Sequence, residues 1–455
     1  MKNDQVHSNC QESVLYLNKI DQFFNKFNIK TILNRSRIRK EKGIHPSTLL
    51  AYIMALPFVG SNFFQGIVQK SDLPFAKDAA YELLKSEKHN WRRFILTLSV
   101  KIIELFDALT RKEREKVMII DDSPIERPRS KVVELLARVF DHCEHKYLRG
   151  FRFLNLSWSD GASFIPIDFA LLSSKKASNR YQGITKDLDK RTCGYKRRQE
   201  ALSKATQLIE PMVARALKLG IKAQYLLVDS WFSWPVIISK LRQHIHVICM
   251  VKDTPKILYT FAGKRLTLSA IYRRIKKRPG KAKILGSVIV IMNDGLPAKI
   301  VFVRNRNTRG WLAILSTNID LPDEEIVRIY GKRWDIEVFF KMAKQFLGLE
   351  KGIQARDFDS LIAHASIVIL RYQFLALEQR RKEDPRTFGA LFRACCQEMK
   401  DLSFMEALSR ILSDVLDRLR QAGEYAEEIY QAVLSTVYAA AIDFFGFNEE
   451  LCQTS

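Results

Sequence analysis

The sequence predicts an α/β fold in which a strand-rich centre lies between two helical ends. Apolar residues recur with helical periodicity over about the first 115 residues, and short apolar runs separated by turn residues replace this pattern from residue 117. Helical periodicity returns beyond residue 322. With 455 residues, 47% of them hydrophobic, the chain is long enough for about two to four structural units with a sizeable core.

Residues 1–115 are predicted to form a helical DNA-binding domain. Basic clusters at 36–43 and at Arg92 and Arg93 lie among its amphipathic segments. Any basic helical domain can carry such clusters, and no helix-turn-helix signature can be assigned to numbered positions. The expectation of DNA binding therefore depends chiefly on net charge. The amphipathic segments are 14–27, 47–59 and 91–109.

Residues 116–252 contain five apolar runs that are typical of strands. The dipeptide Asp160-Gly161 between the second and third is the strongest short hairpin signal in the chain. A helix that ends near Gly220 precedes the fourth, and a long helix follows in 322–380. This order is that of a ribonuclease H-like fold, so both ranges are predicted to build one catalytic core. The runs are 117–123, 151–160, 162–172, 225–231 and 246–252.

The core is predicted to be interrupted and followed by two further regions. Residues 253–321 read as a β-rich insertion, with turn signals at Pro279-Gly280 and at 293–295. Its expected strands include the segment KRLTLSAIY, residues 264–272. Residues 381–455 read as a helical C-terminal region that could supply dimer contacts.

The composition favours a polyanionic partner. Lysine and arginine number 74 against 50 acidic residues, which gives a net charge of +24 and a pI near 9.7. Nucleic acid fits this balance, although a membrane surface could also attract it. The N-terminus lacks the pattern of a signal peptide, and the most apolar stretch, 361–377, is interrupted by His364 and Arg371. A cytoplasmic protein with no membrane partner is expected.

The cysteines indicate neither disulfides nor a zinc site. All seven are scattered without paired CxxC spacing, as in proteins of a reducing compartment. The cluster at 142–145 contains two histidines, but four adjacent residues cannot converge on one ion without a second segment.

Acids follow two of the predicted strands. Asp121 and Asp122 come after the run 117–120, and Asp229 follows 225–228. A carboxylate next to a buried strand is costly unless the loop exposes it or a cation neutralises it. Taken alone, each is an ordinary turn residue as readily as a functional one. In a ribonuclease H-like sheet, however, these positions meet an acid on the later helix.

That helix carries a row of polar residues at offsets 0, 3, 7 and 14. At about 100° per residue, Tyr330, Arg333, Glu337 and Lys344 fall within one arc of about 60°. A solvated helix face is the simplest explanation. An acid flanked by cations on one face also suits a metal-dependent site that contacts DNA phosphates.

These residues resemble the DDE transposases of bacterial insertion sequences, in the group called insertion-sequence family four. The family signature Y-x2-R-x3-E-x6-K is matched at every spacing by the row described above. The resemblance implies Asp122, Asp229 and Glu337 as the catalytic and metal-binding acids. Asp122 is preferred to Asp121 because the family usually has a hydroxyl residue after the catalytic aspartate, here Ser123.

The resemblance also implies cofactors, partners and contacts. Two Mg²⁺ ions are expected, with Mn²⁺ as a substitute, and the partners are double-stranded transposon ends and target DNA held by a homodimer in a synaptic complex. The setting would be the prokaryotic nucleoid. In relatives that form a DNA hairpin, a tryptophan near the end of the insertion stacks on a flipped base, and Trp311 has a similar place. The predicted DNA contacts are Tyr330, Arg333, Lys344, Trp311, Lys341, Arg197 and Arg198.

Two other functions stay open from the sequence. A transposase-derived DNA-binding regulator would keep the fold without catalysis, although it would not need three acids. A nuclease or resolvase would use the same acids to hydrolyse DNA without joining it.

Overall fold

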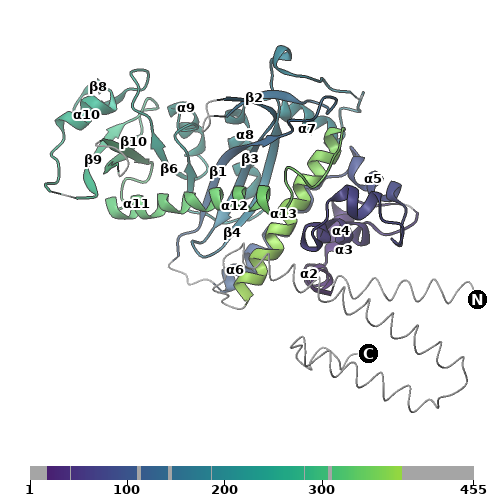
Figure 1. The fold of residues 1–455 in the computed structure, drawn as a ribbon. Helices are drawn as coiled ribbons and strands as arrows, with labels where there is room; N and C mark the ends of the chain where they lie inside the picture. The colour runs from purple at the N-terminus through teal and green to yellow at the C-terminus, as the bar shows by residue number, and fades with distance from the viewer. Residues whose placement is uncertain are drawn as a thin grey trace, which may run out of the picture.

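The computed structural model describes residues 18–381, except residues 41, 110–113, 142–145, 186, 281 and 306–309. The cluster at 142–145 and the predicted region after residue 381 therefore lie outside the described residues. The described chain is a mixed α/β fold around one central, mostly antiparallel sheet (Figure 1).

The first half of the sheet contains parallel and antiparallel neighbours. Strand β3 (Lys146–Ser159) lies between β1 (Val117–Glu126) and β4 (Phe164–Leu172), antiparallel to both. On the other side of β1 follow β5 (Tyr225–Val228) and β6 (His246–Val251), both parallel to it. The spatial order is thus β4-β3-β1-β5-β6. The sequence did not predict the short strand β2 (Ala137–Asp141), which pairs with β3.

The strands of residues 253–321 extend this sheet. Strand β11 (Trp311–Ser316) pairs antiparallel with β6, and β10 (Pro297–Arg304) and β9 (Ile284–Ile291) follow outward. The short strands β7 (Tyr259–Phe261) and β8 (Lys264–Leu266) form the far edge.

The prediction of a strand over residues 264–272 is wrong for most of that segment. Only its first residues are extended, and helix α10 (Leu268–Arg274) begins after Thr267. The Thr267 hydroxyl accepts a hydrogen bond from the backbone N–H of Ala270, which is a typical N-cap.

The N-terminal helices gather at one end of the sheet. Figure 1 shows the N-terminal helices beside helix α13 (Phe358–Arg381), at the end opposite β9, β10 and α10. One continuous cluster of buried side chains runs from these helices through the sheet into α13. The other described helices are α2 (Asn18–Phe27), α3 (Ile29–Arg35), α4 (Pro46–Ala55), η1 (Leu56–Val59), η2 (Phe64–Val68), α5 (Lys77–Lys85), α6 (Trp91–Leu109), η3 (Ala177–Asn179), α7 (Cys193–Ala201), α8 (Ala205–Lys218) and α9 (Pro235–Leu241).

Helix α13 is apolar because it is a core helix. It is long and apolar enough to cross a membrane by length and composition, yet its most apolar window is entirely buried inside the protein. Arg371 lies in this buried stretch and donates hydrogen bonds to the carbonyls of Ile53, Met54 and Leu347. Burial lowers the pKa of Arg371 to about 9. Its guanidinium thereby binds the C-terminal end of α4 to the segment that follows the acid-bearing helix.

The acid-bearing segment is not one straight helix. Helix α11 (Asp323–Gly331) passes through a 3-10 turn, η4 (Lys332–Trp334), into α12 (Asp335–Gln345). Gly348 follows at a positive φ of 80°, a backbone conformation that suits glycine. The polar row of the sequence is thus divided among three elements.

Candidate active site

Asp121 and Asp122 lie inside β1 and on opposite faces of the sheet. The strand continues past them to Glu126 and is paired with β3 throughout, and successive side chains of a strand alternate between faces. The Asp121 carboxylate is 2.6 Å from Nη1 of Arg333, whereas the Asp122 carboxylate is 2.9 Å from Nη1 of Arg152 on β3. The two acids therefore have different surroundings.

Helix α12 covers the face to which Asp121 points. On β3, Phe153 pairs with Ser123 and so shares the face of Asp121. The Phe153 ring packs on Phe339 of α12, with ring centroids 6.5 Å apart. Because Glu337 lies on α12, Asp121 faces the acid-bearing helix.

Asp229 lies beside Asp121 at the same edge of two parallel strands. The pairing of Ile120 with Val228 is the last of the β1–β5 ladder, so residues 121 and 229 are the next positions on the two strands. Desolvation is the largest cause of the raised pKa of both Asp121 and Asp122, and repulsion from Asp229 also helps raise each.

Arg333 is the centre of this group of acids. Its Nη1 lies 2.6 Å from Oδ2 of Asp121 and 3.4 Å from Oε1 of Glu337, so one nitrogen contacts both carboxylates. Burial alone would lower the pKa of Arg333, but Tyr330, Asp121, Asp229 and Glu337 raise it overall. A single guanidinium thus interacts with all three acids of the site.

The buried acids lack full charge compensation. Desolvation raises the pKa of Asp121 to about 7, against the opposing effect of Arg333 and with added repulsion from Asp122 and Asp229. Desolvation likewise raises the pKa of Asp122 to about 6, although Arg152 opposes it. Such raised values are typical of functional carboxylates.

The raised pKa of Asp121 predicts how the stability of the protein depends on pH. Its folded-state pKa of about 7 lies above the ordinary value of about 4, so the folded state binds the extra proton between these limits. The free energy of unfolding should therefore fall as pH rises from 5 to 8 in metal-free buffer, by roughly 1–4 kcal/mol from this group. Urea denaturation at both pH values measures it, and Asp121→Asn should reduce the dependence. An unchanged dependence in that variant would contradict the assignment.

The donors suit a divalent cation but are not yet grouped as a metal site. Among the described residues, no three histidine, cysteine, aspartate or glutamate side chains are arranged to hold a metal ion. The carboxylates of Asp121, Asp229 and Glu337 are nevertheless the oxygen ligands that Mg²⁺ prefers. The shortage of positive charge at Asp121 fits the same chemistry, so these three residues would hold the ion.

The other predicted residues of the row differ in exposure. Tyr330 is buried under the site, and burial raises the pKa of its hydroxyl. Lys341 is exposed on α12. Lys344 is partly exposed, and its Nζ lies 3.8 Å from a carboxylate oxygen of Glu350.

Trp311 begins strand β11 in an aromatic cluster of the insertion. Its ring centroid lies 5.0 Å from that of Tyr272 and 5.1 Å from that of Phe302. The side chain is partly buried against the core, so one part of it is packed and another part stays accessible.

Arg197 and Arg198 require a correction, because the structure buries both. Arg198 is inaccessible, and its guanidinium is held by Glu134 at 2.7 Å and Asp359 at 2.8 Å. Arg197 donates to the carbonyl of Phe169 and stacks over that ring at 4.8 Å. Neither guanidinium can reach a DNA phosphate, so the basic run belongs to the core.

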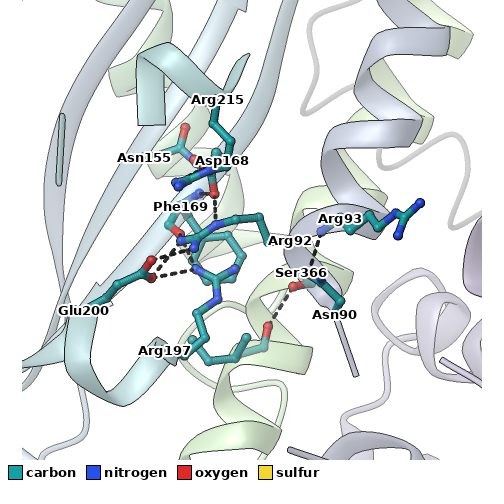
Figure 2. Close-up of polar contacts among 11 residues, drawn as sticks. Asn90, Arg92, Arg93, Asn155, Asp168, Phe169, Arg197, Glu200, Arg215 and Ser366 are labelled. Atoms are coloured by element: carbon teal, nitrogen blue, oxygen red, sulfur yellow. Dashed lines mark hydrogen bonds and ion pairs between the residues drawn. The ribbon is translucent and has the colours of Figure 1, made fainter. Parts of the chain in front are cut away.

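Arg197 belongs to a buried charge network around Asp168. Figure 2 shows Arg92 between Asp168 and Glu200, with Arg215 on the other oxygen of Asp168. Asp168 is 1% exposed, and the arginines lower its pKa against the desolvation that would raise it. The network joins α6, β4, α7 and α8.

Sequence reasoning missed three exposed tryptophans that lie near the acids in the sequence. Trp231 and Trp234 follow Asp229, and Trp334 follows Arg333; their exposed fractions are 44%, 49% and 66%. The Nζ of Lys252 lies 4.6 Å from the centre of the Trp231 ring. Their signal in the sequence was proximity to the acids, in DSWFSW and in RWDIE.

Two family models match the chain. Residues 62–261 match a family described as DDE superfamily endonuclease, and residues 193–372 match one described as Transposase DDE domain. The first range contains Asp121, Asp122 and Asp229, and the second contains Asp229 and Glu337. A search among curated proteins found no match. The two family matches support a transposase of the DDE superfamily with nuclease-type action on DNA.

Proposed function

We propose that this DDE-superfamily transposase cleaves and joins the ends of an insertion sequence of family four by phosphoryl transfer. One observation carries the proposal: Asp121, Asp229 and Glu337 come from two parallel strands and a helix and surround one guanidinium. The strand order β4-β3-β1-β5-β6, with the second strand antiparallel to the first, supports a ribonuclease H-like core. The spacing of Tyr330, Arg333, Glu337 and Lys344 supports the narrower family.

The first acid of the proposed triad is Asp121 rather than Asp122. Asp121 shares the face covered by α12 and contacts the same nitrogen of Arg333 as Glu337 does. Asp122 points to the opposite face and is paired with Arg152. The preference for Asp122 depended on Ser123 alone, and that local signal does not report which face α12 covers.

The residues of the site divide the work of the reaction. When bound by the three acids, Mg²⁺ or Mn²⁺ would activate the attacking oxygen and stabilise the leaving one. Arg333, Lys341 and Lys344 supply positive charge along the row for the phosphates of the strand being cut. Tyr330, the first residue of the row, is buried and precedes the turn η4.

The exposed tryptophans suit a DNA strand that is locally unpaired. An aromatic ring that stacks on a base stabilises binding by about 1–3 kcal/mol. Trp231, Trp234 and Trp334 are exposed and lie close to Asp229 or Glu337 in the sequence, whereas Trp311 is partly packed in the insertion. The proposed function includes cleavage through a DNA hairpin. In that route, a flipped base would stack either on Trp311 or on one of the three exposed tryptophans.

A strand-transfer assay tests the proposed function. The full chain is incubated with DNA that contains the element's ends and with Mg²⁺, and the products are scored for nicks, hairpins and joined DNA. Joined products support the transposase. Hydrolysis alone would indicate a nuclease or resolvase, and binding without cleavage would indicate a regulator. Two ends bound by one homodimer are expected in the active complex.

Lysines of α12 should set part of the salt dependence of DNA binding. Replacing both Lys341 and Lys344 with alanine removes two proposed phosphate contacts, so the slope of log K against log salt should become shallower by roughly two units. Fluorescence anisotropy over a series of salt concentrations measures the slope. Lys218→Ala combined with Lys222→Ala removes two exposed lysines that are not among the predicted DNA contacts, and it serves as a control of equal charge. An unchanged slope in the Lys341 and Lys344 double variant would remove both lysines from the interface.

A further inference from the structure

Arg333 lies where a bound cation is needed. Its guanidinium contacts Asp121 at 2.6 Å and Glu337 at 3.4 Å, and its charge also interacts with Asp229. The side chain is only 15% exposed. This is the position of a counter-ion inside the site rather than that of a side chain extended toward DNA.

Neighbouring cations are engaged with other acids. Lys332, the preceding residue, binds Glu115 through its ammonium group at 3.3 Å. Arg152 pairs with Asp122 on the other face, and Lys344 lies near Glu350. Arg333 is therefore the cation that the structure directs at Asp121.

A guanidinium and a divalent cation compete for the same oxygens. Oδ2 of Asp121 and Oε1 of Glu337 are already occupied by one Arg333 nitrogen, and the described residues present no open group of three ligands. A single positive charge leaves three carboxylates undercompensated, whereas a divalent ion would compensate them better. Arg333 therefore has to leave before the acids can close around an ion.

DNA offers the released side chain a new partner. Arg333 lies on the short turn η4, next to the exposed Trp334, and Glu337 is 42% exposed. A phosphate at this surface can bind a guanidinium through two hydrogen bonds. Release toward DNA would open the site, and by linkage each ligand would favour the other.

We propose that Arg333 is an internal counter-ion that occupies the carboxylate oxygens of Asp121 and Glu337 in the absence of DNA and is displaced when metal and DNA bind together. The inference rests on the proposed function for the identity of the DNA ligand. It goes beyond that function because it assigns Arg333 the role of a competing cation that lowers metal affinity in the DNA-free protein.

Metal binding without DNA tests the proposal directly. Mn²⁺ is titrated into the full-length protein, and free Mn²⁺ is measured by electron paramagnetic resonance. Arg333→Ala should bind Mn²⁺ about 10-fold more tightly than the wild type, because the competing charge is gone. Arg328→Ala removes an arginine of α11 that pairs with Glu325 on the same helix and with Glu115 before β1. It should therefore leave Mn²⁺ affinity unchanged.

A second arm measures coupling to DNA. A short duplex should increase the Mn²⁺ affinity of the wild type and have little effect on that of Arg333→Ala. Arg333→Gln removes the charge but keeps a polar side chain of similar length, and it provides a second variant if the alanine protein fails to fold. Equal or weaker Mn²⁺ binding by folded Arg333 variants without DNA would overturn the proposal, whatever the cleavage assay reports. Loss of cleavage activity with tighter Mn²⁺ binding would uphold it.

Discussion

Asp229→Asn should abolish DNA cleavage while DNA binding stays close to that of the wild type. The substitution keeps the shape of the side chain but removes a charge from the group of acids that would hold the metal, so cleavage should fall by about 10³-fold or more. Gel assays with end-containing DNA and Mg²⁺ measure the rate, and mobility shifts measure binding. Glu337→Gln and Asp121→Asn should have equal effects.

A matched pair of variants tests which aspartate of β1 takes part. Asp121→Asn should inactivate the enzyme, whereas Asp122→Asn should retain cleavage within about 10-fold because its carboxylate pairs with Arg152 on the other face. Asp320→Asn, an exposed acid, serves as the control. Full activity in Asp121→Asn together with inactivity in Asp122→Asn would restore Asp122 as the first acid.

Asp168→Ala should destabilise the protein more than substitutions of the site acids do. Asp168 forms ion pairs with Arg92, whose Nε lies 2.9 Å from Oδ1, and with Arg215, whose Nη2 lies 2.8 Å from Oδ2. The charge of Arg197 also lowers the pKa of Asp168. Removing the acid would leave Arg215 without this anion and Arg92 with Glu200 alone, and breaking a buried ion pair costs about 3–5 kcal/mol. Urea denaturation measures the loss.

Controls separate this effect from a general change of charge. Asp189→Ala removes an exposed acid that pairs with Arg191, and it should unfold like the wild type. The lowered pKa of Asp168 means that its stabilisation is complete above about pH 4 and is lost as pH falls through the folded-state value. Wild-type stability in Asp168→Ala would show that the arginines find other partners.

The sequence predicted features that depend on neighbouring residues. The predicted strands at 117–123, 151–160, 162–172, 225–231 and 246–252 each overlap a strand of the structure, because apolar runs between turn residues are local signals. The positions of Asp121, Asp122 and Asp229 directly after apolar runs could also be read from the sequence. The strand predicted over 264–272 was wrong for a local reason as well, because the N-cap at Thr267 starts a helix within an apolar pattern.

Burial of charge could not be predicted in the same way. Arg197 and Arg198 resemble a surface cluster in the sequence, and their acids, such as Glu134 and Asp359, are distant along the chain. Only the packing of α7 against β4 and α13 brings these partners together. The exposed tryptophans present the converse case, since an aromatic residue beside a strand is more often buried.

The sequence by itself determined the charge of the chain, the main strands and helices, and the presence of acids near the ends of apolar runs, because each of these depends on composition or on short-range periodicity. Tertiary structure alone decided that Asp121 faces α12, that η4 interrupts the polar row, and that Arg333 lies among the acids. Strand pairing sets which face a side chain takes, and a shift of one residue reverses that face. Long-range pairing of β1 with β5 and packing of α12 therefore select the site from residues that are equivalent in the sequence.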